Sequence, residues 1–197
     1  LILAALLLPG LGYVNERARR TLCLSYLRQQ VIGAAHYSND FNGYLPRGHK
    51  SNNNLGSEDL QCLNLDSFFF QVDNYLGGDK GVFSCPNFHE IPGFSGLTDG
   101  YPVESSDYCF LGYVYTGDKD GINSQYGYSF PNRIETAPAD CPIFGDANRQ
   151  SQFNWFISLA PHTRNGGLRE PHSTRTPYEM GAEGGNFAFP DGRASWY

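Results

Sequence analysis

The sequence is short of basic residues and lacks the local motifs of common catalytic sites. Its 197 residues hold 14 Lys and Arg against 20 Asp and Glu, and the basic residues cluster only at Arg17, Arg19 and Arg20. A net charge of −6 with so small a basic cluster argues against a phosphate-binding surface, so we expect no nucleic-acid partner. No G-x-S-x-G elbow, H-E-x-x-H segment or phosphate-binding glycine loop occurs, and we expect no enzymatic activity.

Cysteine is present, but not in a metal-binding pattern. None of the five cysteines belongs to a C-x-x-C pair, so zinc has little support, and an exported protein with disulfides fits better. Among several possible pairings we favour Cys62 with Cys85, joining a helix to the following loop, and Cys109 with Cys141, joining two strands. Each bridge would stabilise the fold by roughly 3–4 kcal/mol. Cys23 would then stay unpaired on the N-terminal helix, buried against the head.

Titratable side chains are frequent in the C-terminal third, where an acid–base or metal site could be assembled. None of them has the spacing of a known ligand motif, so we interpret them as polar residues of surface loops. These side chains are Asp146, His162, Glu170, His172, Glu179, Glu183 and Asp191.

The N-terminal region, residues 1–38, predicts one long helix with two different halves. Residues 1–14, LILAALLLPGLGYV, are apolar on every side, so this part needs lipid or other helices around it. The second half is amphipathic, because its apolar residues recur every three or four positions and would pack against a globular head formed by residues 39–197. The packing residues are Leu24, Leu27, Val31, Ala34 and Ala35.

The apolar run is shorter than the roughly 20 residues that span a membrane, so we expect the chain to begin inside a longer hydrophobic segment. A short buried helix or the apolar part of a signal peptide are the alternatives. Proline removes a backbone donor, so the helix should kink or open locally near residues 9–12. The residues expected in a filament core or membrane are Leu1, Ile2, Leu3, Leu6, Leu7, Leu8, Pro9, Leu11 and Val14.

The remaining sequence predicts an α+β fold with long loops, because 23 Gly and 12 Pro interrupt it while 13 Tyr and 14 Phe supply a core. Apolar spacing predicts a second helix over 60–76. Aromatic and β-branched runs predict antiparallel strands at 108–116, 125–130 and 141–145, and an Asp-Gly turn predicts a hairpin over 184–196. Residues 88–106 and 147–183 are expected to be loops at the outer surface, making lateral contacts.

Two polar turns have oxygen ligands that calcium could use. Asp118, Asp120 and Asn123 have part of the spacing of a calcium loop, but no bidentate glutamate follows, so a hairpin turn is the alternative. Asp40 and Asn42 could also bind calcium, although a helix end with an Asx turn at Asn42-Gly43 accounts for them more simply. We therefore predict no cofactor with certainty, and calcium is the one candidate that these turns offer.

Four segments together carry a family resemblance. The run over 1–30 is similar to the N-terminal helix of type IV pilin-like and type II secretion pseudopilin-like proteins, specifically the planctomycete-type prepilin N-terminal methylation family. Tyr-x-x-Asp-x-x-Gly-x-x-Pro at 37–46 and Phe-x-Cys-Pro at 83–86 are also similar to that family. The C-terminal hairpin resembles its H-x9-D-G terminus, with two departures: Gly181 stands where the family has histidine, and Arg193 follows the Asp-Gly.

This resemblance implies a structural subunit that polymerises through its apolar helix into an extracellular filament or secretion pseudopilus. Its partners would be further copies of itself, possibly other pilins, and the inner-membrane assembly machinery, since such subunits are inserted in that membrane before assembly. The three clustered arginines would then pair with acidic residues of neighbouring subunits. The alternative is a surface carbohydrate-binding or adhesion protein with a membrane-anchoring helix, since exposed aromatics beside Asn/Asp-rich loops also suit sugar rings.

Overall fold

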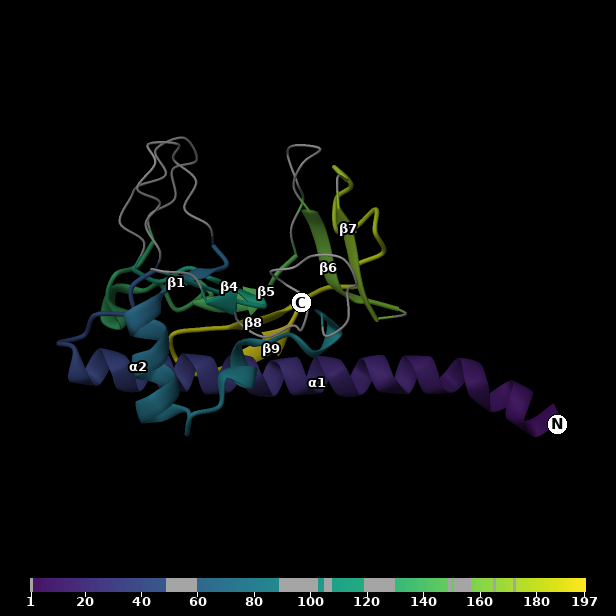
Figure 1. Ribbon diagram of the computed structural model, residues 1–197, viewed down its shortest axis with the longest axis horizontal. Helices are drawn as coiled ribbons and strands as arrows, with labels where there is room; N and C mark the ends of the chain where they lie inside the picture. The colour runs from purple at the N-terminus through teal and green to yellow at the C-terminus, as the bar shows by residue number, and fades with distance from the viewer. Residues whose placement is uncertain are drawn as a thin grey trace.

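The computed structural model describes residues 2–48, 60–88, 103–104, 108–118, 130–148, 150, 157–164, 166–171 and 173–197, with the backbone alone for 2–10. It is an α+β fold in which one N-terminal helix lies across a head of small antiparallel sheets. Figure 1 shows helix α1 (Ile2–Asp40) running beneath the head and extending beyond it at the N-terminal end. The predicted fold class is confirmed at this level.

The sequence accounts for the buried face of helix α1 and for the place where the helix ends. Its buried residues recur at the helical period, with Cys23, Leu27, Val31 and Ala34 all at most 1% exposed, so one stripe faces the head. The helix ends two residues later than predicted, in the expected turn over 41–43, where Asn42 (φ 53°) and Gly43 (φ 86°) adopt left-handed backbone.

The N-terminal part of α1 is helical through residues 9–12, so the single chain shows no local opening there. Its axis bends near the N-terminal end (Figure 1). Among the residues whose side chains are described, no helix is long and apolar enough to cross a membrane.

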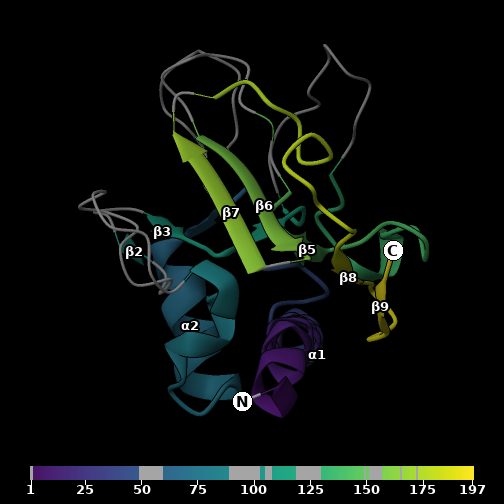
Figure 2. The same ribbon diagram turned by 90° about the vertical axis from the view of Figure 1, so that its right-hand side faces the viewer.

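The second helix is shorter than predicted. The apolar pattern over 60–76 divides into strand β1 (Cys62–Asn64) and helix α2 (Leu65–Tyr75). The division falls at Asn64, whose side chain accepts a hydrogen bond from Ser67 N at 3.3 Å and caps the helix. Because β1 pairs with a neighbouring strand, its three residues gain a sheet ladder instead of a helical turn. Figure 2 shows α2 beside α1 on the same side of the head.

Two antiparallel sheets carry most of the head. The first has the order β1-β3-β2, with β2 at Val103–Glu104 and β3 at Tyr108–Phe110. The second has the order β4-β5-β8-β9 and lies on α1. Its strands are β4 (Tyr113–Tyr115), β5 (Phe144–Asp146), β8 (Asn186–Ala188) and β9 (Ala194–Trp196). Short 3-10 turns η1 (Lys80–Phe83), η2 (Pro86–Phe88) and η3 (Ile134–Thr136) connect these elements.

The predicted strand over 108–116 is divided between the two sheets. The chain turns at Gly112, whose N–H donates to Phe83 O at 2.9 Å instead of joining a ladder. The predicted strand over 141–145 is observed at 144–146, after a turn in which Cys141 N donates to Pro138 O. The C-terminal hairpin is confirmed, with Phe187 opposite Ser195 and Gly192 in the turn at φ 84°. The strand predicted at 125–130 lies outside the described residues except for Phe130, which is in no strand.

A third sheet was not predicted. Strands β6 (Ile157–Thr163) and β7 (Gly166–Pro171) form an antiparallel pair within the segment expected to be loop, and β2 interrupts the other such segment. The sequence concealed β6 because Pro161 stands inside it, and proline argues against a central strand. An irregularity in the register between Ala160 and Thr163 accommodates that proline.

Replacing Gly112 with alanine is expected to lower the free energy of unfolding by about 1–3 kcal/mol. The added Cβ would lie 2.6 Å from the backbone nitrogen of Cys85 and 3.2 Å from Phe83 O, and neither is a flexible side chain. Urea unfolding followed by far-UV circular dichroism measures the loss. Gly12→Ala is the control, since nothing lies within 4 Å of its added Cβ. Equal losses in the two variants would contradict crowding as the cause.

Candidate functional site

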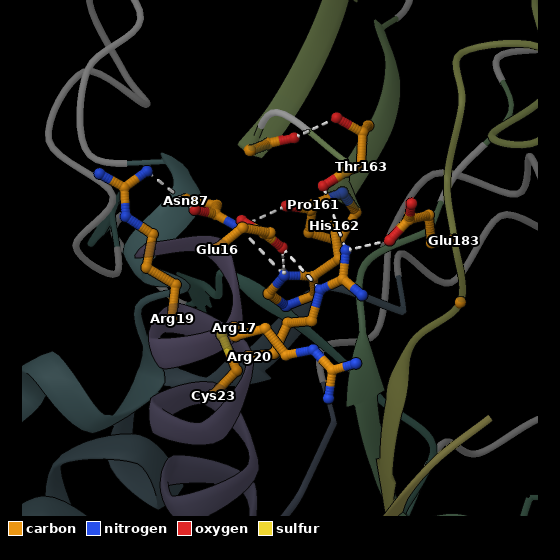
Figure 3. Close-up of polar contacts among 12 residues, drawn as sticks. Glu16, Arg17, Arg19, Arg20, Cys23, Asn87, Pro161, His162, Thr163 and Glu183 are labelled. Carbon is orange, nitrogen blue, oxygen red and sulfur yellow. Dashed lines mark hydrogen bonds and ion pairs between the residues drawn. The ribbon is translucent and has the colours of Figure 1, made fainter. Parts of the chain in front are cut away.

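The candidate site is a buried polar cluster between α1 and the head, centred on Glu16. This carboxylate is 2% exposed, and it receives hydrogen bonds from three directions. Arg20 Nε donates to Oε1 at 2.9 Å, His162 Nδ1 lies 2.8 Å from Oε1, and Asn87 Nδ2 donates to Oε2 at 2.9 Å. Figure 3 shows these side chains converging on Glu16 from α1, η2 and β6. Burial raises the pKa of Glu16, but the bonds from His162, Arg20 and Asn87 outweigh it and lower the pKa below its usual value.

His162 lies on β6, is fully buried, and has its two ring nitrogens in different surroundings. Asn87 has two amide hydrogens, and they are taken by Glu16 Oε2 and by Pro161 O at 2.7 Å. Asn87 therefore has no hydrogen left for Nδ1, so we assign the Nδ1 proton to a bond toward Glu16. The opposite nitrogen, Nε2, is in ion-pair contact with Asp146 Oδ2 at 3.3 Å and has no hydrogen-bond partner among the described residues.

Two thiols lie beside the His162 ring. Cys23 Sγ, from α1, is 3.5 Å from Cys85 Sγ, which follows η1, and both residues are fully buried. Both sulfurs and a ring nitrogen of His162 lie within 4.8 Å of one another. Burial raises the pKa of Cys23, whereas its contacts with Cys85 and His162 lower it, to a net value of about 7. Burial drives the pKa of Cys85 well above its usual value.

Asp146, the last residue of β5, borders the cluster. Its Oδ2 accepts from Asn186 N at 2.6 Å and from Asn186 Nδ2 at 3.0 Å, which ties β5 to β8. Its Oδ1 is buried and has no hydrogen-bond partner. Burial lowers the pKa of His162, but Asp146, Cys23 and Glu16 together raise it to about 11.

Arg17, Arg19 and Arg20 of α1 each make a hydrogen bond within their own chain, and their pairing with neighbouring subunits stays a prediction. Arg20 bridges Glu16 and Glu183, whose Oε2 is 2.7 Å away, and its guanidinium lies 4.5 Å from the centre of the Trp196 ring. Arg19 donates to Asn87 Oδ1 at 3.1 Å. Arg17 donates to Tyr13 OH at 2.8 Å. The sequence shows only the Arg20–Glu16 pair, at the helical spacing of four, because Glu183 and Asn87 come from segments far along the chain and Tyr13 is neutral.

The residues expected along α1 fall into two environments. Leu27, Val31 and Ala34 belong to the hydrophobic core, while Leu24 and Ala35 are partly buried. Leu11 and Val14 are exposed by 55% and 61%. For the other expected filament-core residues the side chains lie outside the described part, and only the backbone helix from Ile2 is given. They are Leu1, Ile2, Leu3, Leu6, Leu7, Leu8 and Pro9.

The structure contains neither of the disulfides expected from the sequence. All five cysteines carry thiols, and Cys85 lies against Cys23 instead of Cys62. Cys109 is opposite Leu63 in the β1–β3 ladder, so Cys62, one residue along, points to the other face of the sheet. Cys141 precedes a strand of the other sheet. Sequence spacing could not reveal that α1 brings Cys23 to the thiol of Cys85.

Most of the calcium ligands expected in the 118–123 turn are not among the residues that the structure describes. Asp120 and Asn123 lie outside the described residues, whereas Asp118 has left-handed backbone (φ 34°) and its N–H donates to Pro131 O. Asp40 accepts a hydrogen bond from Tyr75 OH, which links the end of α1 to α2.

Two of the seven C-terminal titratable residues are buried in the cluster instead of lying in surface loops: Asp146 and His162. Glu170 is paired with Arg175 and Asp191 with Arg193, while Glu179 accepts hydrogen bonds from Thr176. His172 lies outside the described residues. Sequence reasoning gave Glu16 no role, although Glu16, Arg20 and Cys23 share one helix face at spacings of four and seven.

Comparisons with known proteins add no relative. No protein-family model, curated protein or solved structure matches the chain.

Proposed function

We propose that the chain is a structural subunit of a type IV pilus-like extracellular filament or secretion pseudopilus. One observation carries the proposal: α1 is a single 39-residue helix whose rear half forms the core of the head while its front extends beyond the head. The described apolar side chains at that front, Leu11, Tyr13 and Val14, are 45–61% exposed. An exposed apolar helix of this kind is suited to burial among copies of itself.

Assembly would bundle the front helices at the filament centre and leave the heads outside. The contact would be heterologous: one surface of each subunit would bind a different surface of the next. Because this head-to-tail contact repeats without closing, it generates helical symmetry. Apolar burial of the front helices would drive assembly, and the exposed arginines Arg17 and Arg19 are available to pair with acidic residues of neighbouring subunits. Before assembly the front helix is inserted in the inner membrane, and afterwards the filament lies outside the cell.

Substituting Glu for both Leu11 and Val14 in the full chain is expected to abolish filaments while leaving the head folded. Carboxylates at these positions would have to be buried unpaired inside a bundle, which costs far more than their exposure on a single chain. Electron microscopy of negatively stained material measures filaments, and circular dichroism measures folding.

The matched control places Glu at Leu22 and Ile32, which are 42% and 50% exposed on the rear half of the same helix. We expect these variants to form filaments. Dispersed particles from the unmodified chain, or equal filament loss in both pairs, would contradict the proposal. Glycan binding by those dispersed particles would instead favour the adhesion protein.

A further inference from the structure

We propose that Cys23, Cys85 and His162 bind a Zn²⁺ ion. The site does not depend on whether the chain polymerises. Its donors come from three segments, α1, the turn after η1, and β6, so the metal would join the N-terminal helix to the head.

The sulfur spacing fits a shared metal better than a covalent bond. A tetrahedral zinc ion with Zn–S bonds of about 2.3 Å separates two sulfurs by roughly 3.8 Å. A disulfide requires about 2.05 Å. Cys23 Sγ and Cys85 Sγ lie 3.5 Å apart, in hydrogen-bond contact as thiols, so only a small separation would bring them to the first value.

His162 is oriented as a metal ligand. Nδ1 donates to Glu16 Oε1 at a nitrogen–oxygen distance of 2.8 Å, so Nε2 is the nitrogen that would lose its proton on metal binding and offer its lone pair to the ion. Metal-binding histidines commonly donate their other ring N–H to a carboxylate, which fixes the ring and raises its basicity. A buried ring nitrogen without a hydrogen bond is costly, and a metal ion would satisfy it.

The three donors select zinc over the common oxygen-binding cations. Two thiolates and an imidazole are ligands that Zn²⁺ prefers, whereas Ca²⁺ and Mg²⁺ prefer oxygen alone. The ion would neutralise the two thiolate charges. Asp146 lies beside the set, with Oδ2 bonded to Asn186 and 3.3 Å from His162 Nε2, and its buried Oδ1 has no hydrogen-bond partner among the described residues.

Titration of the reduced, metal-depleted full chain with Co²⁺ tests the site. We expect one ion per chain, a thiolate-to-cobalt charge-transfer absorption, and displacement by Zn²⁺. Cys85→Ser should lose most of that absorption, whereas Cys141→Ser, at a partly exposed thiol outside the cluster, should keep it. Glu16→Gln should weaken zinc affinity about 10- to 100-fold, because it alters the group that orients His162.

The unmodified chain alone can overturn the proposal, so the test does not depend on every variant folding. Absence of the thiolate-to-cobalt absorption would overturn the proposal. A Cys23–Cys85 disulfide, found by peptide mass spectrometry in chain isolated without reductant, would also overturn it. Among folded variants, undiminished absorption in Cys85→Ser would exclude that thiol as a ligand and overturn the assignment.

Discussion

Replacing Glu16 with alanine is expected to lower the free energy of unfolding by about 3–5 kcal/mol, because it leaves a buried charge without its partner. The carboxylate accepts from Arg20, His162 and Asn87, and all three donors would lose their acceptor at once. Urea unfolding in the presence of a metal chelator, followed by circular dichroism, measures the loss independently of any bound ion.

Glu183→Ala is the matched control for Glu16, since both carboxylates contact Arg20. Glu183 is 39% exposed, so its ion pair is screened by water and its removal should cost at most about 1 kcal/mol. Glu16→Gln should fall between the two, because the amide keeps an oxygen acceptor. If Glu16→Ala and Glu183→Ala lost the same free energy, burial would not be what makes Glu16 important.

The second large effect is expected from Leu27→Ala, which should cost about 2–5 kcal/mol through a cavity between α1 and the head. Leu27 is fully buried at the centre of the apolar stripe of the helix. Leu22→Ala removes the same atoms five residues earlier, from a side chain that is 42% exposed, and should change stability by less than about 1 kcal/mol.

Thermal or urea unfolding of the two leucine variants side by side decides the point. A similar small loss in both would mean that the rear half of α1 does not hold the head together. A large loss for Leu27→Ala alone would mean that helix and head unfold as one cooperative unit.

The parts of the fold that could be predicted depend on local chemistry. The rear half of α1 follows from apolar residues at helical spacing, its end from Asn42-Gly43, and the last hairpin from its Asp-Gly turn. The β6–β7 pair was missed because Pro161 argued against a strand, and the first turn expected of α2 became β1 because a partner strand was available. In both cases tertiary pairing outweighed local preference.

The buried cluster could be predicted only in fragments. Glu16 and Cys23 lie two turns apart on one helix face, and this much is readable from the sequence. Their partners are 62 residues away at Cys85 and 146 residues away at His162. No spacing rule connects positions so distant, so only the folded chain shows that a carboxylate, an imidazole and two thiols form one buried cluster.

The contacts of Glu16 and Cys23 also fix the phase of α1 against the head. A helix turns by about 100° per residue, so a rotation or slide by one position would bring Arg17 toward the place that Glu16 occupies. A cation there would face His162 of the head, which would lose its partner Glu16. These contacts therefore favour one rotational position of α1 on the head. A torque applied to the free N-terminal end of the helix would then be transmitted to the head.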